Sequence, residues 1–149
     1  MSVLKAIGSG LVGAAALTLV HESARRFIES APRLDVLGMR AIAKSMHAVD
    51  QEPPAPLHEL ALVGDIVSNS LYYSLVAAGD REGAFARGAL LGLGAGLGAV
   101  FLPEPLGLGR QPTEHAPETQ AMTIAWYVAG GLAAAAAYRL LTDSAGESE

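Results

Sequence analysis

Four long apolar runs, separated by polar segments, dominate the pattern of the chain. They cover residues 3–22, 60–79, 84–103 and 119–140, and the fourth contains a stretch, 119–138, without a charged side chain. A helix needs about 20 mostly apolar residues to cross the hydrocarbon core of a bilayer. A soluble amphipathic helix would carry charges at 3.6-residue spacing, which the fourth run lacks. The pattern therefore predicts an all-α fold, an integral membrane four-helix bundle with one span per run.

The polar segments between the runs predict the rest of the organisation. The first mixes apolar and basic residues, which indicates an amphipathic interfacial helix at 33–48, between the first two spans. Residues 79–83 form a short polar turn, which makes the second and third spans antiparallel neighbours. The end, 143–149, is expected to be a short disordered acidic tail. We expect residues 1–149 to form a single transmembrane domain, and its first helix to stay uncleaved because no small-x-small site follows Val20.

Composition excludes several kinds of chemistry. The chain is 51% hydrophobic, 5% aromatic and 17% charged, and it has no cysteine. The lack of cysteine rules out disulfides, thiolate catalysis and iron–sulfur clusters. A net charge of −5 without a basic stripe argues against a nucleic-acid partner. We therefore expect the lipid bilayer as the main partner, together with other membrane proteins or a second copy of the chain.

Glycines in the third run recur at the spacing of a helix-packing stripe. Gly88, Gly92 and Gly96 lie four residues apart, and Gly94 and Gly98 repeat the spacing about half a turn away. Such stripes let helix backbones approach closely inside a membrane, where no hydrophobic effect drives helices together. We expect close helix packing here. The favoured partner is another span of the same chain, and the alternative is a seam between copies.

One ionisable residue lies well inside an apolar run. Asp65 is in the second run, and Asn69 and Tyr72 follow at i+4 and i+7, so the three share a helix face. A charge at such depth costs roughly 3 kcal/mol on insertion scales unless it is paired, hydrated or protonated. This polar face is therefore a candidate functional site. The structural alternative is an ion pair between Asp65 and a basic side chain at the end of the first span.

The first span ends in polar residues that supply further candidates. His21, Glu22 and Arg25 follow its apolar run, and Glu22 lies at i−3 and i−4 from Arg25 and Arg26, which favours local ion pairs. The His-Glu dipeptide is not a metalloprotease motif, because the residue four positions after His21 is an arginine.

With four spans, all four histidines fall on one membrane face: His21, His47, His58 and His115. No two of them have metal-ligand spacing on one helix, so we expect no metal and no cofactor. Six of the ten basic residues also lie on this face, and this bias predicts that the histidine-rich loops are cytoplasmic. The high alanine and glycine content fits a bacterial inner membrane.

Two functional hypotheses remain open. The first is a small polytopic membrane protein without enzymatic activity, an accessory subunit of a membrane complex or a minimal carrier or channel, with Asp65 and Asn69 as its polar centre. The second is a membrane-embedded enzyme or redox protein that uses His21, Glu22, Asp65 and Tyr72 and binds a lipid, quinone or haem near the histidine-rich face. The chain lacks a nucleophile motif, a phosphate loop and paired metal ligands, which favours the first hypothesis.

Overall fold

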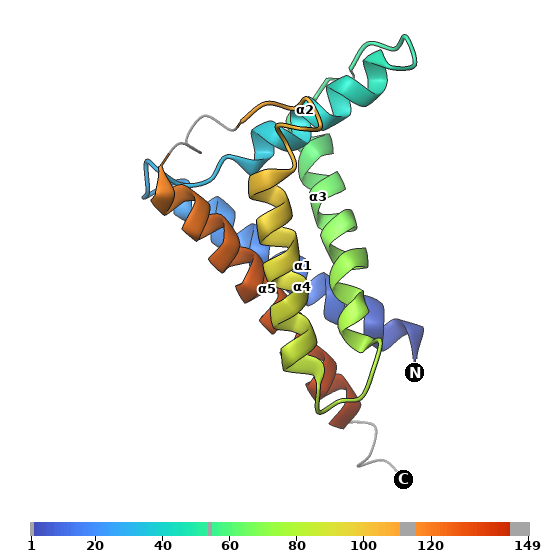
Figure 1. The fold of residues 1–149 in the computed structure, drawn as a ribbon. Helices are drawn as coiled ribbons and strands as arrows, with labels where there is room; N and C mark the ends of the chain where they lie inside the picture. The colour runs from blue at the N-terminus through green and yellow to red at the C-terminus, as the bar shows by residue number, and fades with distance from the viewer. Residues whose placement is uncertain (1, 54, 111–115, 144–149) are drawn as a thin grey trace.

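The computed structural model describes residues 2–53, 55–110 and 116–143, and all regular structure within these ranges is helical. The all-α prediction is thus confirmed. In chain order the elements are α1 (Val3–Ala24), α2 (Leu34–His47), α3 (Leu57–Ser74), the short 3-10 helix η1 (Leu75–Ala77), α4 (Ala84–Phe101) and α5 (Pro117–Asp143) (Figure 1).

Each predicted span contains one long helix, and the boundaries differ by a few residues. The third span was expected to reach residue 103, but α4 ends at Phe101, because Pro103 has no N–H with which to continue the helical hydrogen bonds. The helix predicted at 33–48 is α2; its place at a membrane interface stays a prediction, as does the description of the fold as a bundle. Asp143, predicted as the first residue of the disordered tail, is the last residue of α5, and the rest of the tail lies outside the described residues, as does His115.

Four helices are long and apolar enough to cross a membrane: α1, α3 with η1, α4 and α5. Their outward surfaces carry large apolar side chains, such as Leu4 (82% exposed), Leu90 (68%) and Leu140 (67%). Soluble proteins rarely expose extensive apolar surface, whereas a bilayer solvates it. Length, composition and surface together indicate a membrane protein.

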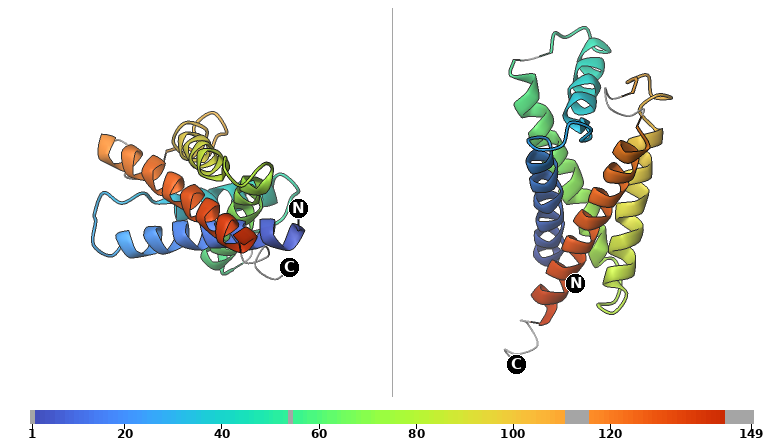
Figure 2. Two further views of the ribbon diagram at one scale, coloured as in Figure 1. Left: turned by 90° about the horizontal axis from the view of Figure 1, so that it is seen from below. Right: turned by 90° about the vertical axis from the view of Figure 1, so that its left-hand side faces the viewer.

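The four long helices lie side by side, and α2 crosses one end of them (Figures 1 and 2). The main contacts join α4 to α5, α1 to α5 and α1 to α3, and α2 packs against α3. The start of α1 and the end of α5 lie toward the end opposite α2. The polar residues that surround α2 are therefore far from the turn that joins η1 to α4.

The backbones of α4 and α5 approach each other closely. Gly88, Gly92 and Gly96 are all buried on α4. A Cβ added at Gly92 would lie 2.5 Å from Cα of Val128, and one added at Gly96 would lie 2.7 Å from Cα of Ile124. Only a residue without a side chain fits at these positions, so the stripe contacts α5 of the same chain.

The second glycine stripe is different. A Cβ at Gly94 would lie 3.4 Å from the hydroxyl of Tyr72, and one at Gly98 would lie 3.4 Å from Cδ1 of Leu102 in its own helix. Neither glycine would bring a Cβ against the backbone of another helix. Close backbone approach thus explains the first stripe and not the second.

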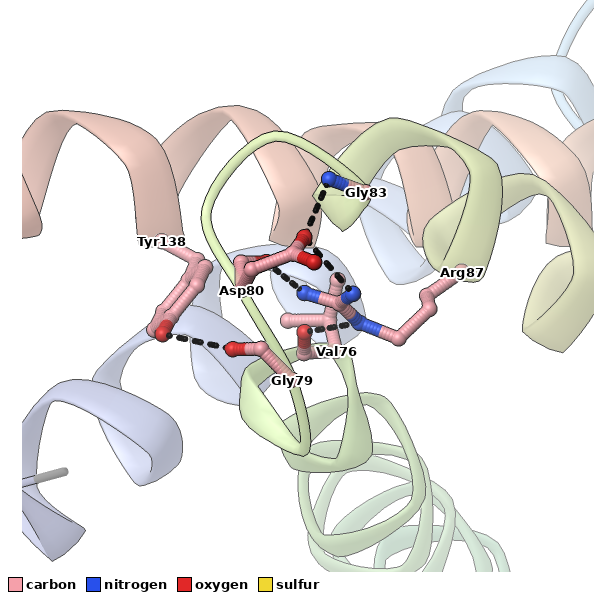
Figure 3. Close-up of polar contacts among 6 residues, drawn as sticks. All are labelled: Val76, Gly79, Asp80, Gly83, Arg87 and Tyr138. Carbon is pink, nitrogen blue, oxygen red and sulfur yellow. Dashed lines mark hydrogen bonds and ion pairs between the residues drawn. The ribbon is translucent and has the colours of Figure 1, made fainter.

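Arg87 closes the turn at the end remote from α2 (Figure 3). Its Nε donates to the carbonyl of Val76 at 2.9 Å, and its Nη2 donates to the carbonyl of Asp80. The Asp80 carboxylate accepts a 2.6 Å hydrogen bond from the Gly83 amide, and this bond, with help from Arg87, lowers the pKa of Asp80 below its usual value. These contacts satisfy carbonyls that have no partner at the end of a helix.

Candidate functional site

A cavity of about 260 Å³ lies between the C-terminal half of α1, α2 and the N-terminal half of α3. Small-molecule sites usually enclose about 300–1,000 Å³ and are lined mainly by apolar side chains with a few polar groups. This cavity is slightly smaller than that range, which limits it to a small molecule. Its apolar wall consists of Pro32, Leu34, Ala41, Ile42, Ala61 and Leu62.

Two glycines shape the cavity where α2 meets α3. A Cβ added at Gly38 of α2 would lie 3.3 Å from Cβ of Ala61, so Gly38 allows α2 to pack closely on α3. Gly64 of α3 also lines the cavity, and a Cβ added there would meet no atom within 4 Å. The first glycine brings the walls together, and the second leaves space between them.

The position of α2 above the cavity is fixed by the connection that follows α4. Lys44 donates from Nζ to the carbonyl of Leu106 at 2.6 Å. Arg40 donates from Nη1 to the carbonyls of Leu108 and Arg110, at 3.1 and 2.8 Å. Two basic side chains of α2 thus bind a segment more than sixty residues away in the sequence, and these hydrogen bonds help to position α2.

Asp65 lines the cavity from α3, and within the described residues its carboxylate has one hydrogen-bond partner. Nδ2 of Asn69, one turn later, donates to Oδ1 at 2.8 Å. Among the described residues Asp65 forms no ion pair, so the alternative of a structural pair with the end of α1 is not what the structure shows. A carboxylate in an apolar setting accepts more than one hydrogen bond, and most of this capacity stays available.

Arginines at the cavity rim are already engaged by carboxylates. Nη1 of Arg25 lies 3.2 Å from Oε1 of Glu22 and 3.2 Å from Oδ2 of Asp35, contacts that are ion pairs without hydrogen-bond alignment. Arg33 donates to both oxygens of Asp35, at 3.0 and 3.1 Å. Partial burial raises the pKa of Asp35, but the hydrogen bonds from Arg33 and the charge of Arg25 outweigh it, so the net pKa lies below the usual value.

Two buried polar atoms on α1 have no hydrogen-bond partner within the described part of the chain. They are Nε2 of His21 and Oγ1 of Thr18, and both residues line the cavity. His21 is only 8% exposed, and its ring packs edge-on against Trp126, with centroids 5.0 Å apart. A buried polar group that stays unpaired costs about 1–3 kcal/mol. These two atoms therefore need an explanation.

Of the six polar candidates from the sequence, the structure brings four to the cavity: His21, Glu22, Arg25 and Asp65. Asn69 supports Asp65 from the next turn. Tyr72 lies elsewhere: its hydroxyl donates to the carbonyl of Leu91 in α4 at 3.0 Å. Asp65 and Tyr72 are thus in different environments, although they were predicted to share a helix face. The N-terminal part of α3 packs against α2, whereas Tyr72, nearer its C-terminal end, contacts α4.

Sequence reasoning missed Thr18 and Asp35 and did not separate His58 from the other histidines. All three line the cavity. Thr18 could have been found, because it precedes His21 by three residues and so shares its helix face. Asp35 could not, because only the packing of α2 brings it to Arg25.

Within the described residues, no group of three His, Cys, Asp or Glu side chains could hold a metal ion. Comparison of the chain with family models, with curated proteins and with solved structures finds no match. The geometry of the cavity therefore carries the functional argument.

Proposed function

We propose that the chain is a non-enzymatic membrane protein that binds a small amphipathic molecule in the cavity between α1, α2 and α3, either as a minimal carrier or as the ligand-binding subunit of a larger complex. One observation carries the proposal. An apolar cavity has buried, unpartnered polar atoms of His21 and Thr18 on its wall, opposite the helix that carries Asp65.

Both the unpaired polar atoms and the apolar wall of the cavity favour binding of an amphipathic molecule. Unpaired buried groups destabilise a protein, and a core of purely apolar side chains would avoid this cost. A bound molecule removes the cost by donating to or accepting from these atoms. Its apolar part gains about 25 cal/mol per Å² of area that it buries against the wall. Together these contributions suit binding of a molecule with a polar head and an apolar body.

The acidic groups at the cavity support binding rather than turnover. Glu22 and Asp35 both lie against arginines, an arrangement that favours a structural or electrostatic role over proton transfer. A general base usually has a pKa near the working pH, whereas the arginines hold the pKa of Asp35 below its usual value.

We further propose a bacterial inner membrane as the location, with the α2 end on the cytoplasmic side. Arg25, Arg33, Arg40 and Lys44 gather at this end, consistent with the positive-inside rule for short loops. In this orientation a ligand would reach the cavity from the cytoplasm or from the inner leaflet.

The experiment that tests the proposal uses Gly64→Phe. The full-length protein is purified in mild detergent, bound small molecules are extracted, and mass spectrometry quantifies them per mole of protein. Because a Cβ at Gly64 meets open space, the variant should fold and should lose at least about nine-tenths of the bound molecule by occupying the cavity. Gly8→Phe is the matched control, since Gly8 is on α1 outside the cavity lining and its added Cβ makes only ordinary contact, 3.6 Å from Leu141.

Three results would contradict the proposal. The wild-type protein could carry no small molecule, the Gly64→Phe variant could retain as much as the wild type, or the Gly8→Phe control could lose an equal share. Recovery of a quinone or a haem would instead support the enzyme or redox hypothesis, with His21 as the residue placed to contact its polar group.

A further inference from the structure

We propose that the ligand of this cavity is a small organic cation, an ammonium-type head group on an apolar body, with the carboxylate of Asp65 as its counter-ion. The inference rests on the proposed function and adds the chemical class of the ligand. It is carried by the charges around the cavity and by the hydrogen-bonding groups that the described residues leave unpaired.

Charge around the cavity leaves one acid without a basic partner. The lining residues include the acids Glu22, Asp35 and Asp65 and a single fully charged base, Arg25. Arg25 lies between Glu22 and Asp35, and Arg33 binds Asp35 from outside the lining. Two arginines thus neutralise two acids, and the acid left without a basic partner among the described residues is Asp65.

This balance separates three classes of ligand. An anion would need a free cation, but both arginines at the rim are already paired with carboxylates. A neutral molecule would leave Asp65 either as an uncompensated charge in an apolar environment, which is costly inside a membrane, or protonated. A cation compensates it directly, and the attraction is strong because the surroundings screen charge poorly.

The hydrogen-bonding groups of the cavity fit the same head group. A primary ammonium has three N–H donors and no acceptor. Within the described residues the Asp65 carboxylate accepts one hydrogen bond, from Asn69. Thr18 offers a hydroxyl oxygen and His21 offers Nε2, which accepts when the ring proton is on Nδ1. With Asp65 these atoms give three acceptors on residues that line the cavity, beside one donor without a hydrogen bond, Nη1 of Arg25.

The apolar wall excludes a bare metal ion as the natural occupant. Calcium takes six to eight oxygen ligands and magnesium an octahedral set, whereas the part of the lining that α2 contributes includes apolar side chains such as Leu34, Ala41 and Ile42. These side chains suit a small hydrocarbon body. An organic cation combines both requirements.

The test compares three probes of nearly equal size and different charge: benzylammonium, benzyl alcohol and benzoate. The full-length protein in lipid nanodiscs is titrated with each probe by calorimetry. The fluorescence of Trp126 gives a second readout. Trp126 is the sole tryptophan, and its ring centroid lies 5.0 Å from that of His21, which lines the cavity. We expect benzylammonium to bind at least about tenfold more tightly than the other two probes.

Variants of α3 then locate the charge that is responsible. Asp65→Asn should weaken benzylammonium binding at least about tenfold, and Asp65→Glu, which keeps the charge, should retain the preference for the cation. Glu59→Gln is the matched control: it removes the same charge from the same helix, but Glu59 is exposed and outside the cavity lining. This control should change binding less than about twofold.

Each other outcome overturns the inference. If benzyl alcohol binds as tightly as benzylammonium and Asp65→Asn changes neither, the cation class is wrong while ligand binding in the cavity stands. Tighter binding of benzoate also refutes the cation. If no probe binds, the inference fails, and the extraction experiment with Gly64→Phe decides separately whether the cavity holds a ligand.

Discussion

Substitution of Gly92 by alanine should destabilise the contact between α4 and α5. The added Cβ would lie 2.5 Å from Cα of Val128 and 2.8 Å from the carbonyl carbon of Tyr127, so the first distance falls 0.9 Å short of the 3.4 Å of ordinary contact. Both atoms belong to the backbone and cannot rotate away, so the helices must separate. Overpacking of this kind costs about 1–3 kcal/mol, and alanine recovers up to about 1 kcal/mol of helix propensity. We expect a net loss of about 1–2 kcal/mol.

The assay is unfolding in mixed micelles with rising dodecyl sulfate, followed by far-UV circular dichroism. Gly98→Ala is the matched control, because its Cβ reaches only Cδ1 of Leu102, a flexible side chain, at 3.4 Å. The control should keep or gain stability, by up to about 1 kcal/mol. If Gly92→Ala were as stable as Gly98→Ala, the helices would not be held at the observed distance, and the argument from close backbone approach would be wrong.

Two further predictions concern charged groups outside the helix contacts. Arg87→Ala should lower stability by about 1–3 kcal/mol, because it leaves the carbonyls of Val76 and Asp80 without their donor; an unchanged unfolding midpoint in dodecyl sulfate would contradict this. Asp35 has a lowered pKa when folded, so its contribution to stability is present above the unfolded pKa of about 3.9 and is lost as pH falls through the lower folded value. Unfolding midpoints between pH 6 and pH 3 should therefore fall more for the wild type than for Asp35→Asn, and equal slopes would show that Arg33 and Arg25 do not stabilise this carboxylate.

Hydrophobic pattern was enough to predict the long helices, because crossing a membrane fixes both the length and the composition of a helix. The end of α4 was less predictable. Its span was expected to continue to residue 103, because hydropathy continues through Phe101 and Leu102, although the proline at 103, which has no N–H to continue the helical hydrogen bonds, is visible in the sequence. Hydropathy indicates where apolar side chains continue, and proline indicates where helical hydrogen bonding ends.

The candidate site was predictable as far as each residue could be recognised alone. Asp65 stood out because a carboxylate within an apolar run is rare. The cavity itself was not predictable, since it depends on where α2 packs and therefore on Gly38, Arg40 and Lys44. Nor could the sequence show which acids the arginines had already neutralised, and that distinction decides which charge is left for a ligand.

The two packing regimes of the protein have opposite consequences for a bound molecule. Between α4 and α5 the backbones touch and leave no room, whereas α1, α2 and α3 enclose a cavity with unpaired polar atoms. A ligand that pairs those atoms stabilises the folded state by about 2.7 kcal/mol at a hundred times its Kd. This gain exceeds the loss of about 1–2 kcal/mol expected from Gly92→Ala. Occupancy of the cavity and close packing of α4 against α5 both contribute to the one folding equilibrium, so a saturating ligand should raise the stability of wild type and Gly92→Ala by the same amount and leave the difference between them unchanged.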